Sequence, residues 1–326
     1  MTVLVTGSAG HLGEALMRLL RERGDEACGL DLRPSRFTNV VGSITDRGLV
    51  REAMAGVRAV LHTATLHKPH VATHRRQDFV DSNVTGTLVL LEEALRAGVA
   101  AFVQTSTTSV FGDAMAHRAG EPAIWIDESV TPLPRNIYGA TKLAAEHLCR
   151  EVARNAGLPV VILRTSRFFP EEDDSAVARA SFARDNLQAL ELLYRRADLA
   201  DMASAHLLAI ERAAEAGIGP FIVSATTPFT QTDLPELGRD AAASIRAHFP
   251  ESETLFADRG WRFPESIDRV YSNQRAREAL GWRPQYDFRH LLDCLAQGRD
   301  FRSELARAVG SKGYHDQVFA DGPYPV

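Results

Sequence analysis

The chain has 326 residues, of which 45% are hydrophobic and 24% charged, a balance typical of a globular protein with a large core. Its formal net charge of −5 offers no positive excess for nucleic acid, and its apolar runs stay shorter than a membrane-spanning helix. Three widely spaced cysteines predict reduced thiols and no metal site. Because a strand is predicted from residue 2, leaving no room for a signal peptide, we expect a cytoplasmic protein.

The first elements in chain order are a strand, a glycine-rich turn and a helix. Thr2 to Thr6 is a β-branched run, Gly7-Ser8-Ala9-Gly10-His11-Leu12-Gly13 follows, and residues 14–20 have helical spacing. In this context, glycines three apart allow a tight turn, close approach of a pyrophosphate and packing of helix on strand. The turn therefore predicts a dinucleotide site at the helix N-terminus, and the competing interpretation is a turn without a ligand.

A second predicted strand, Ala27 to Leu30, ends at Asp31. A carboxylate here binds the ribose hydroxyls of NAD, and its charge repels the 2′-phosphate of NADP. Arg33, two residues later, could instead accommodate that phosphate. We therefore predict NAD as the cofactor and regard NADP as less favoured.

Strands and helices then alternate up to Arg164. Buried strands are predicted at 57–62, 101–105 and 160–163, with long helices at 77–98 and 136–157. This alternation predicts an α/β fold with a doubly wound parallel sheet, the Rossmann arrangement.

The regular alternation of strands and helices ends after Arg164. Residues 168–174 are acidic and rich in turn formers, a helix is predicted at 201–216, and Phe221-Ile222-Val223 looks like a strand returning to the sheet. We expect residues 1–165 to form the NAD-binding domain, with 199–226 rejoining it. A smaller substrate-binding part would comprise residues 166–198 and 227–326. Residues 313–326 have little pattern, which fits a poorly ordered tail or a partner-facing arm.

Tyr138 and Lys142 lie four apart on the helix predicted at 136–157, in a chain with only three lysines. They share one helix face, and arginine's planar fork does not replace a compact ammonium beside a phenol. A cation about 4 Å away is worth roughly 4 kcal/mol at an effective dielectric of 20. The lysine could thus bring the pKa of the phenol near neutrality, where acid/base catalysis works best. The alternative is an ordinary surface pair.

Together these motifs resemble the extended short-chain dehydrogenase/reductase superfamily, specifically its NAD-dependent epimerase/dehydratase family, over nearly the whole chain. The family's Thr-Gly-x-x-Gly-x-x-Gly appears as Thr6 to Gly13, and its Tyr-x-x-x-Lys as Tyr138 and Lys142. Other similar segments are Gly42-Ser43-Ile44, His62-Thr63-Ala64, Asn83 to Thr87, Thr105 to Gly112, and Leu280-Gly281-Trp282-Arg283-Pro284.

The resemblance implies an enzyme in which Thr107 orients the reacting hydroxyl, Tyr138 is the acid/base, and Lys142 tunes Tyr138 and holds the nicotinamide ribose. The implied cofactor contacts are Gly7, Gly10, His11, Leu12, Gly13, Asp31, Leu32, Arg33, Ser43, Ile44, Thr63, Ala64, Thr65, His67, Asn83, Thr105, Tyr138, Lys142 and Ser166. Thr107, Thr108 and Arg167 would contact the substrate. The competing role of Thr107 is a strand-end hydroxyl bonded to backbone, and that of Arg167 is an ion pair with Glu171 or Asp173.

Three departures from the family pattern bear on the substrate. Thr108-Ser109 stands where sugar dehydratases carry Asp-Glu, so dehydration is not expected. Ser166-Arg167-Phe168-Phe169-Pro170 replaces Asn-Val-Tyr-Gly-Pro. The stretch 170–195 is shorter than nucleotide-sugar enzymes use to enclose the nucleotide, and Tyr194 replaces an arginine.

These departures predict an NAD-dependent oxidoreductase or epimerase acting on a secondary alcohol of a polyhydroxylated, sugar-like molecule without a nucleotide. The residues leave open whether the hydride returns to the substrate or leaves as NADH. One alternative is a nucleotide-sugar 4-epimerase, in which Arg195 or Arg196 binds the phosphates, although we expect this pair to brace Asp198 and Asp201. Another is a non-catalytic, NAD-sensing protein. By family analogy, helices near 77–97 and 136–156 would pair in a homodimer.

Eleven histidines raise the question of a metal. His70 and His74 are four apart, but Pro69 makes a helix doubtful and no carboxylate completes a zinc set, so we predict none. His67 follows the strand that ends at His62, and we expect it near the cofactor pyrophosphate.

Overall fold

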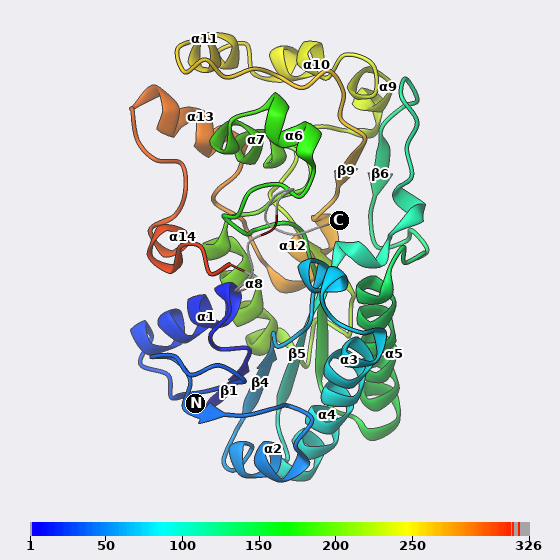
Figure 1. Cartoon of the computed structure of the whole chain (residues 1–326), viewed down its shortest axis with the longest axis vertical. Helices are drawn as coiled ribbons and strands as arrows, with labels where there is room; N and C mark the ends of the chain where they lie inside the picture. Colours follow the sequence, from blue (N-terminus) through cyan, green and yellow to red (C-terminus); the bar gives the residue numbers. More distant parts are fainter. Residues whose placement is uncertain (1, 314, 316–318, 320–326) are drawn as a thin grey trace.

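The computed structural model describes residues 2–313, 315 and 319. In this part of the chain, seven parallel strands form one sheet in the order β3-β2-β1-β4-β5-β7-β8 (Figure 1). The strands are β1 Val3–Thr6, β2 Ala27–Asp31, β3 Val40–Val41, β4 Ala59–His62, β5 Ala101–Thr107, β7 Val160–Thr165 and β8 Phe221–Val223. The strand order reverses between β1 and β4, as in dinucleotide-binding folds, and the predicted doubly wound sheet is confirmed.

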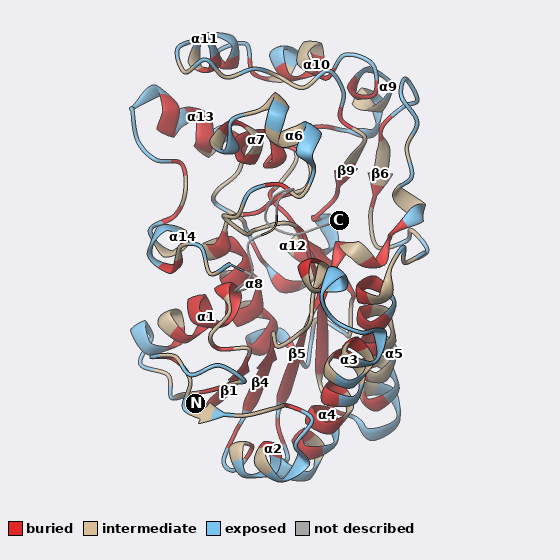
Figure 2. Ribbon diagram, in the orientation of Figure 1, coloured by how far each residue is buried: buried red, intermediate tan, exposed pale blue. Residues whose placement is uncertain are grey.

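Helices cover both faces of the sheet because successive side chains of each strand point to opposite sides. Val3 and Val5 belong to the core beside α1 (His11–Glu22) and α8 (Leu199–Arg212). Leu4 belongs to the core beside α2 (Arg47–Ala53), α4 (Gly86–Ala97) and α5 (Ile137–Ala156). Figure 2 shows the resulting buried sheet between exposed outer helix faces. This two-sided burial explains the nearly continuous apolar runs of the strands.

The helix expected at 77–98 consists of three pieces. These are α3 Arg76–Phe79, a π-helical turn Val80–Thr85 and α4. The wider turn carries Asn83, whose Oδ1 accepts hydrogen bonds from the Leu66 N–H (2.9 Å) and the Thr65 hydroxyl (2.9 Å). Its Nδ2 donates to the Thr141 hydroxyl in α5 (3.0 Å). The π-turn thus lets one side chain join the loop after β4 to α5, the kind of local deviation often found at functional sites.

A second group of elements lies above the carboxyl ends of the strands (Figure 1). Strands β6 Ile124–Ile126 and β9 Arg269–Tyr271 pair in parallel. The helices of this group are α6 Ala176–Ser181, α7 Arg184–Glu191, α9 Leu234–Leu237, α10 Ala241–His248, α11 Ser252–Ala257 and α13 Phe288–Ala296. Helices α12 Gln274–Leu280 and α14 Glu304–Val309 instead contribute Ala276, Leu280 and Val309 to the core beside α1 and α8. Short 3-10 turns occupy Lys68–Ala72, Thr108–Val110, Asp113–Met115 and Gln231–Asp233. Helices α7, α9, α10, α11 and α13 share their own hydrophobic core, and we call this group the cap.

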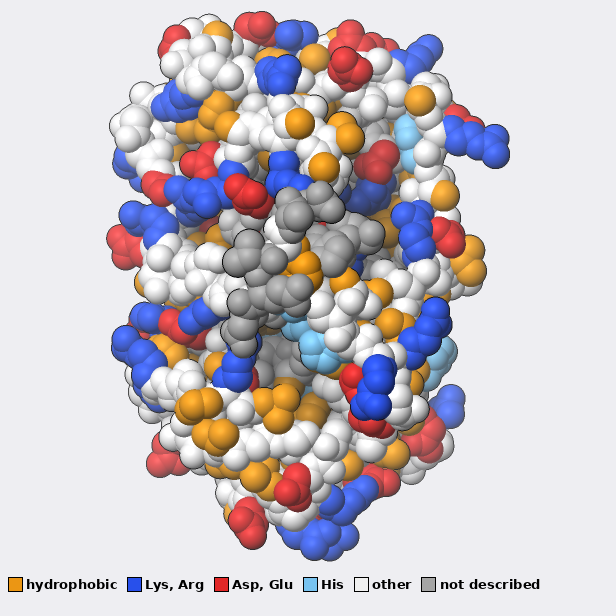
Figure 3. Space-filling model, viewed as in Figure 1, with side chains coloured by type: hydrophobic (Ala, Val, Ile, Leu, Met, Phe, Trp, Pro, Cys, Tyr) orange, Lys and Arg blue, Asp and Glu red, His pale blue; other side chains and the backbone are white. Residues whose placement is uncertain are grey.

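Residues 199–226 supply α8, which packs on α1, and β8, which pairs with β7. The functional division between residues 1–165 and the remainder stays a prediction. The prediction about the tail at 313–326 falls largely outside the described residues. Among residues 2–313, 315 and 319, no helix has the length and apolar character needed to cross a bilayer. Basic and acidic side chains are interspersed on the face that Figure 3 shows.

Candidate active site

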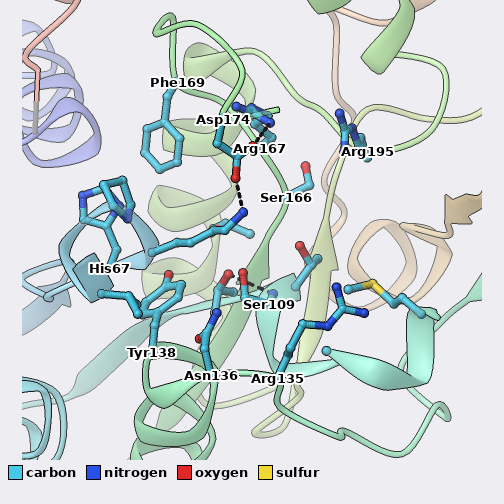
Figure 4. Close-up of a pocket in the computed structure, with 18 of the residues that line it drawn as sticks. His67, Ser109, Arg135, Asn136, Tyr138, Ser166, Arg167, Phe169, Asp174 and Arg195 are labelled. Atoms are coloured by element: carbon cyan, nitrogen blue, oxygen red, sulfur yellow. Dashed lines mark hydrogen bonds and ion pairs between the residues drawn. The ribbon is translucent and has the colours of Figure 1, made fainter. Parts of the chain in front are cut away.

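A cavity of about 930 Å³ lies where β5 and β7 end, beneath the cap (Figure 4). Its sheet-side lining includes Thr107, Thr108, Ser109, Asn136, Tyr138, Ser166 and Arg167. Its cap-side lining includes Arg195, Asp268, Arg269 and Tyr271. Ligands of open parallel sheets bind outside the carboxyl ends of the strands, so this cavity occupies the expected place for a substrate.

Tyr138 reaches the cavity from the first turn of α5. Asn136 caps this helix, because its Oδ1 accepts a hydrogen bond from the Gly139 N–H (3.0 Å). Gly139 packs so closely that an added Cβ would lie 2.8 Å from the Ser109 carbonyl oxygen. The helix start is therefore pressed against the loop after β5, and Tyr138 and Thr107 both line the cavity.

Burial is the largest cause of the pKa shifts of Tyr138 and Lys142. It raises the pKa of Tyr138 to about 12, and the hydrogen bond with Thr107 acts in the opposite direction. It lowers the pKa of Lys142 to about 8, against the opposing effects of Cys149 and Glu146. From the sequence, the pKa of the phenol was expected near neutrality. In the structure this pKa is raised instead, because burial destabilises the phenolate more than the surrounding groups stabilise it.

The glycine-rich turn has the shape that a pyrophosphate site needs. Gly7 has a φ of 74°, in the left-handed region. A Cβ on Gly13 would lie 2.0 Å from the Gly7 carbonyl oxygen, and one on Gly10 would lie 3.2 Å from the same atom. Gly10 precedes α1 and provides no side-chain cap for the first turn of α1. The close approach of turn and helix, together with the uncapped N-terminus, fits a dinucleotide phosphate.

Asp31 lies at the end of β2 beside this turn. Its carboxylate accepts hydrogen bonds from the Ala9 N–H (2.9 Å) and the Arg33 N–H (2.9 Å). Leu32 is 69% exposed, so the segment after Asp31 forms an open edge of the fold. Ser43 and Ile44 follow β3, next in the sheet after β2. This edge is where the sequence places the adenosine half of the cofactor.

The segment after β4 is fixed against β1. The Thr63 hydroxyl donates to the Thr6 carbonyl oxygen (2.7 Å), and the Ala64 N–H donates to the Thr6 hydroxyl (3.3 Å). His67 lies farther along, in the lining of the cavity, with its ring centroid 6.4 Å from that of Tyr138 and 5.6 Å from that of Phe169. His67 therefore neighbours the proposed acid/base, a contact that the sequence did not predict.

Two predicted cofactor residues bind protein groups instead of lining the cavity. Asn83 is buried and holds Thr65, Leu66 and Thr141, as described above. The Thr105 hydroxyl is hydrogen-bonded to His206 Nε2 in α8 (2.9 Å). These contacts suit residues that position the site.

Ser166 is different, because it is 3% exposed and its hydroxyl has no hydrogen-bond partner among the described residues. Buried polar groups are nearly always hydrogen-bonded, so this oxygen in the cavity lining is available to a ligand atom or a water molecule. Figure 4 shows Ser166 and Tyr138 on opposite sides of the same cavity.

The arginines that follow β7 and α7 are held by acidic side chains. Arg167 Nη1 lies 2.6 Å from Asp173 Oδ2, so the ion pair considered for it forms while Arg167 also lines the cavity. Arg195 Nη2 lies 2.8 Å from Glu191 Oε1, and Arg196 Nε lies 2.7 Å from Glu191 Oε2. Burial opposes the charge on Glu191, but these three arginines lower its pKa to about 2.

The prediction that Arg195 and Arg196 brace Asp198 and Asp201 is wrong. The turn after α7 folds both arginines back onto Glu191, four and five residues earlier. Asp198 instead caps α8 and accepts a hydrogen bond from the Ser303 hydroxyl. Asp201 accepts the N–H groups of the Gln285-Tyr286 segment.

Two ion pairs and one carboxylate join segments around the cavity. Lys68, after β4, pairs with Asp174 before α6. Lys312, near the C-terminus, pairs with Glu14 of α1. Glu171 accepts hydrogen bonds from the Ser311 hydroxyl (2.8 Å) and the Lys312 N–H (3.0 Å). Glu171, in the acidic stretch 168–174, thus connects His11 at the start of α1 to the C-terminal segment.

Part of the cavity lining was not predicted from the sequence. Asn136 could have been found, because an asparagine two residues before Tyr138 at a helix start signals an N-cap. Arg135, Arg269 and Tyr271 carry no such signal, since only the tertiary structure brings them to the cavity. In the described part of the chain, no group of three or more His, Cys, Asp or Glu side chains is arranged to hold a metal ion.

Known proteins share this fold and these motifs. A model of the NAD dependent epimerase/dehydratase family matches residues 3–222. The UDP-glucose 4-epimerase of Rhizobium meliloti is 29% identical over 87% of this chain and 93% of its own length. The UDP-glucose 4-epimerase of Erwinia amylovora is 31% identical but matches only 50% of this chain and 52% of its own.

Solved structures agree with the family match. A short-chain dehydrogenase/reductase superfamily protein from Agrobacterium tumefaciens, solved with bound NAD, has a TM-score of 0.64 at 27% identity and covers 94% of this chain and 99% of its own. The UDP-N-acetylglucosamine 4-epimerase from Bacillus cereus shares the fold with a TM-score of 0.63 at 20% identity, covering 91% of this chain and 98% of its own. The chain therefore belongs to the NAD dependent epimerase/dehydratase family and is an enzyme of the extended short-chain dehydrogenase/reductase type.

Proposed function

We propose that this enzyme oxidises a secondary alcohol of a sugar, with Tyr138 as the acid/base. The observation that carries the proposal is one cavity lined by Tyr138, Thr107 and Ser166, whose hydroxyl has no partner among the described residues. Thr107 would hold the substrate oxygen while Tyr138 takes its proton. Lys142, one helical turn behind Tyr138, would stabilise the phenolate.

Bound NAD would supply the hydride acceptor, and this chain's residues fit it. Gly7, Gly10 and Gly13 leave room for a pyrophosphate at the N-terminus of α1, and Asp31 would bind the adenosine ribose. If the hydride returns to the other face of the substrate, the reaction is an epimerisation; if it leaves as NADH, the enzyme is a dehydrogenase.

We expect NAD to bind at least about tenfold more tightly than NADP, a difference of about 1.4 kcal/mol, because the Asp31 carboxylate repels a 2′-phosphate. Calorimetric titration of both cofactors measures it. Asp31→Ala should narrow the difference, and Arg33→Ala should leave NAD affinity unchanged. Equal or tighter NADP binding by the unaltered chain would mean that Arg33 overrides Asp31.

We infer that the sugar is nucleotide-linked, which revises the expectation from sequence. The support is the similarity to UDP-glucose 4-epimerases, one of them along 93% of its length. The cavity, about 930 Å³, lies near the upper end of the roughly 300–1,000 Å³ typical of small-molecule sites. The lining also holds basic side chains that could contact a diphosphate, each of them ion-paired with a carboxylate of the chain: Lys68, Arg135, Arg167, Arg195 and Arg269.

A free polyhydroxylated sugar is the second candidate, and a specific observation favours it. Asp173 and Glu191 already hold Arg167 and Arg195, so a diphosphate would have to compete with two carboxylates. The shortened stretch between Pro170 and Arg195 argues in the same direction.

Calorimetry on the NAD-loaded protein with UDP, UDP-glucose and free glucose separates the two candidates. We expect micromolar binding of UDP-glucose, weakened about tenfold or more in Arg195→Ala and unchanged in the control Arg239→Ala, on the exposed surface. No binding of UDP or UDP-glucose, with NADH formed from free sugars, would favour the second candidate.

The homodimer through α4 and α5 and the cytoplasmic location also remain proposals. The first rests on family analogy and the second on the sequence alone.

A further inference from the structure

Glu146 is a buried carboxylate one helical turn after Lys142 on α5, and it is 0% exposed. Arg164 of β7, 2% exposed, donates from Nε to Oε1 (2.9 Å) and from Nη2 to Oε2 (2.8 Å). The Ser106 hydroxyl of β5 donates to Oε1 (2.6 Å). One side chain therefore ties the helix that carries Tyr138 and Lys142 to both strands that end at the cavity.

These contacts lie directly behind the cavity lining. Ser106 precedes Thr107, and Arg164 precedes Ser166 by two residues. The two strand ends are also joined by a hydrogen bond from the Thr165 hydroxyl to the Ser106 carbonyl oxygen (2.9 Å). A buried ion pair is costly to desolvate, and apolar residues of similar volume often serve stability equally well. The stability of the fold alone therefore does not require this pair.

The Glu146–Arg164 pair can instead be explained by the charge that it places beside Lys142. The titratable groups around Lys142 are Tyr138, Glu146 and Cys149 on α5 and His62 on β4. Burial raises the pKa of Cys149 to about 12 and, with the charge of Lys142, lowers the pKa of His62 well below its usual value. Thiol and imidazole are thus neutral at neutral pH, as is Tyr138, and Glu146 is the anion that remains beside the ammonium.

We propose that Glu146 is a positioning residue that supplies the negative charge supporting the Lys142 ammonium, and that Arg164 and Ser106 fix this charge and the helix. The proposal rests on the function assigned above to Tyr138 and Lys142. Removing Glu146 should make Lys142 easier to deprotonate. Removing Arg164 should make it harder, because the charge of Glu146 would then be opposed only by Arg150, whose Nη2 lies 3.4 Å from Oε2 and whose side chain is 31% exposed.

The scarcity of lysine makes a direct measurement possible. The chain labelled with ε-¹³C lysine contains three labelled side chains, and the signal lost in Lys142→Met identifies Lys142. Titrating this signal against pH should give a midpoint about one pH unit lower in Glu146→Gln and about one unit higher in Arg164→Met than in the unaltered chain. Glu151→Gln, a matched change on the exposed face of α5, should leave it in place.

A purely structural role would destabilise both single variants without moving the two midpoints in opposite directions. Unchanged midpoints, or shifts of the same sign, would overturn the proposal. If either single variant fails to fold, the double variant Glu146→Gln, Arg164→Met removes both buried charges. The Lys142 midpoint of this double variant should lie below that of the unaltered chain. A higher midpoint contradicts the proposal. Because the titration needs no substrate, its failure is distinguishable from loss of the function assigned to Tyr138, which turnover measurements test.

Discussion

Replacing Tyr138 with phenylalanine should leave NAD binding intact and remove most of the turnover. The change deletes one oxygen and keeps the ring, which is 9% exposed and packed at the start of α5. The hydroxyl's contact with Thr107 places it at the cavity, and losing a general acid/base typically costs about 10²–10⁴-fold in rate.

The measurement is turnover of the sugar identified in the binding experiments, alongside calorimetric titration with NAD. Tyr194→Phe is the matched control, because Tyr194 is a partly buried tyrosine outside the cavity lining. Near-normal turnover in Tyr138→Phe would remove Tyr138 from the mechanism. Loss of NAD binding in this variant would show that the hydroxyl also contributes to holding the cofactor.

Gly13→Ala should abolish or severely weaken NAD binding. The new Cβ would lie 2.0 Å from the carbonyl oxygen and 2.6 Å from the carbonyl carbon of Gly7, and 2.8 Å from Ser8 Cα. These are backbone atoms of the turn itself, so α1 must move away from β1. We expect a stability loss of about 1–3 kcal/mol, as for other overpacked sites, and at least about a tenfold loss in NAD affinity.

Gly24→Ala provides the comparison for this second variant. Gly24 follows the same helix with a φ of 75°, and an added Cβ would meet nothing within 4 Å. The variant should lose about 1–2 kcal/mol of stability through backbone strain alone, with NAD affinity unchanged. Thermal unfolding and NAD titration of both variants measure the two effects. Normal NAD affinity in Gly13→Ala would contradict the placement of the pyrophosphate.

The fold and the cofactor turn were predictable because their determinants are local. Alternating side chains of buried parallel strands must be apolar on both faces, which gives short β-branched runs such as Val3 to Val5. The constraint on Gly7 and Gly13 likewise acts across six residues. Spacing along the chain therefore carried this information.

The cavity wall was not predictable in the same way. Arg269 and Tyr271 line it from β9, more than 130 residues after Tyr138, and no short pattern links them. The pKa of Tyr138 depends on how deeply the folded chain buries the phenol, which the spacing of Tyr138 and Lys142 does not reveal, so the predicted direction of the pKa shift was wrong. The partner of Arg195 was within reach of sequence reasoning, because Glu191 lies four residues earlier at the end of α7.

The placement of lysine has a practical consequence for handling the protein. Lys142 lies behind Tyr138, Lys68 lines the cavity, and Lys312 is paired with Glu14 beside the glycine-rich turn. Arginine supplies the remaining side-chain positive charge, and acylating reagents do not modify it under mild conditions. Because Lys142 is 2% exposed, coupling the protein to a bead or sensor chip through lysine side-chain amines would use Lys68 or Lys312, and coupling at Lys68 would obstruct the cleft that is to be measured. Immobilisation through an affinity tag leaves that cleft open.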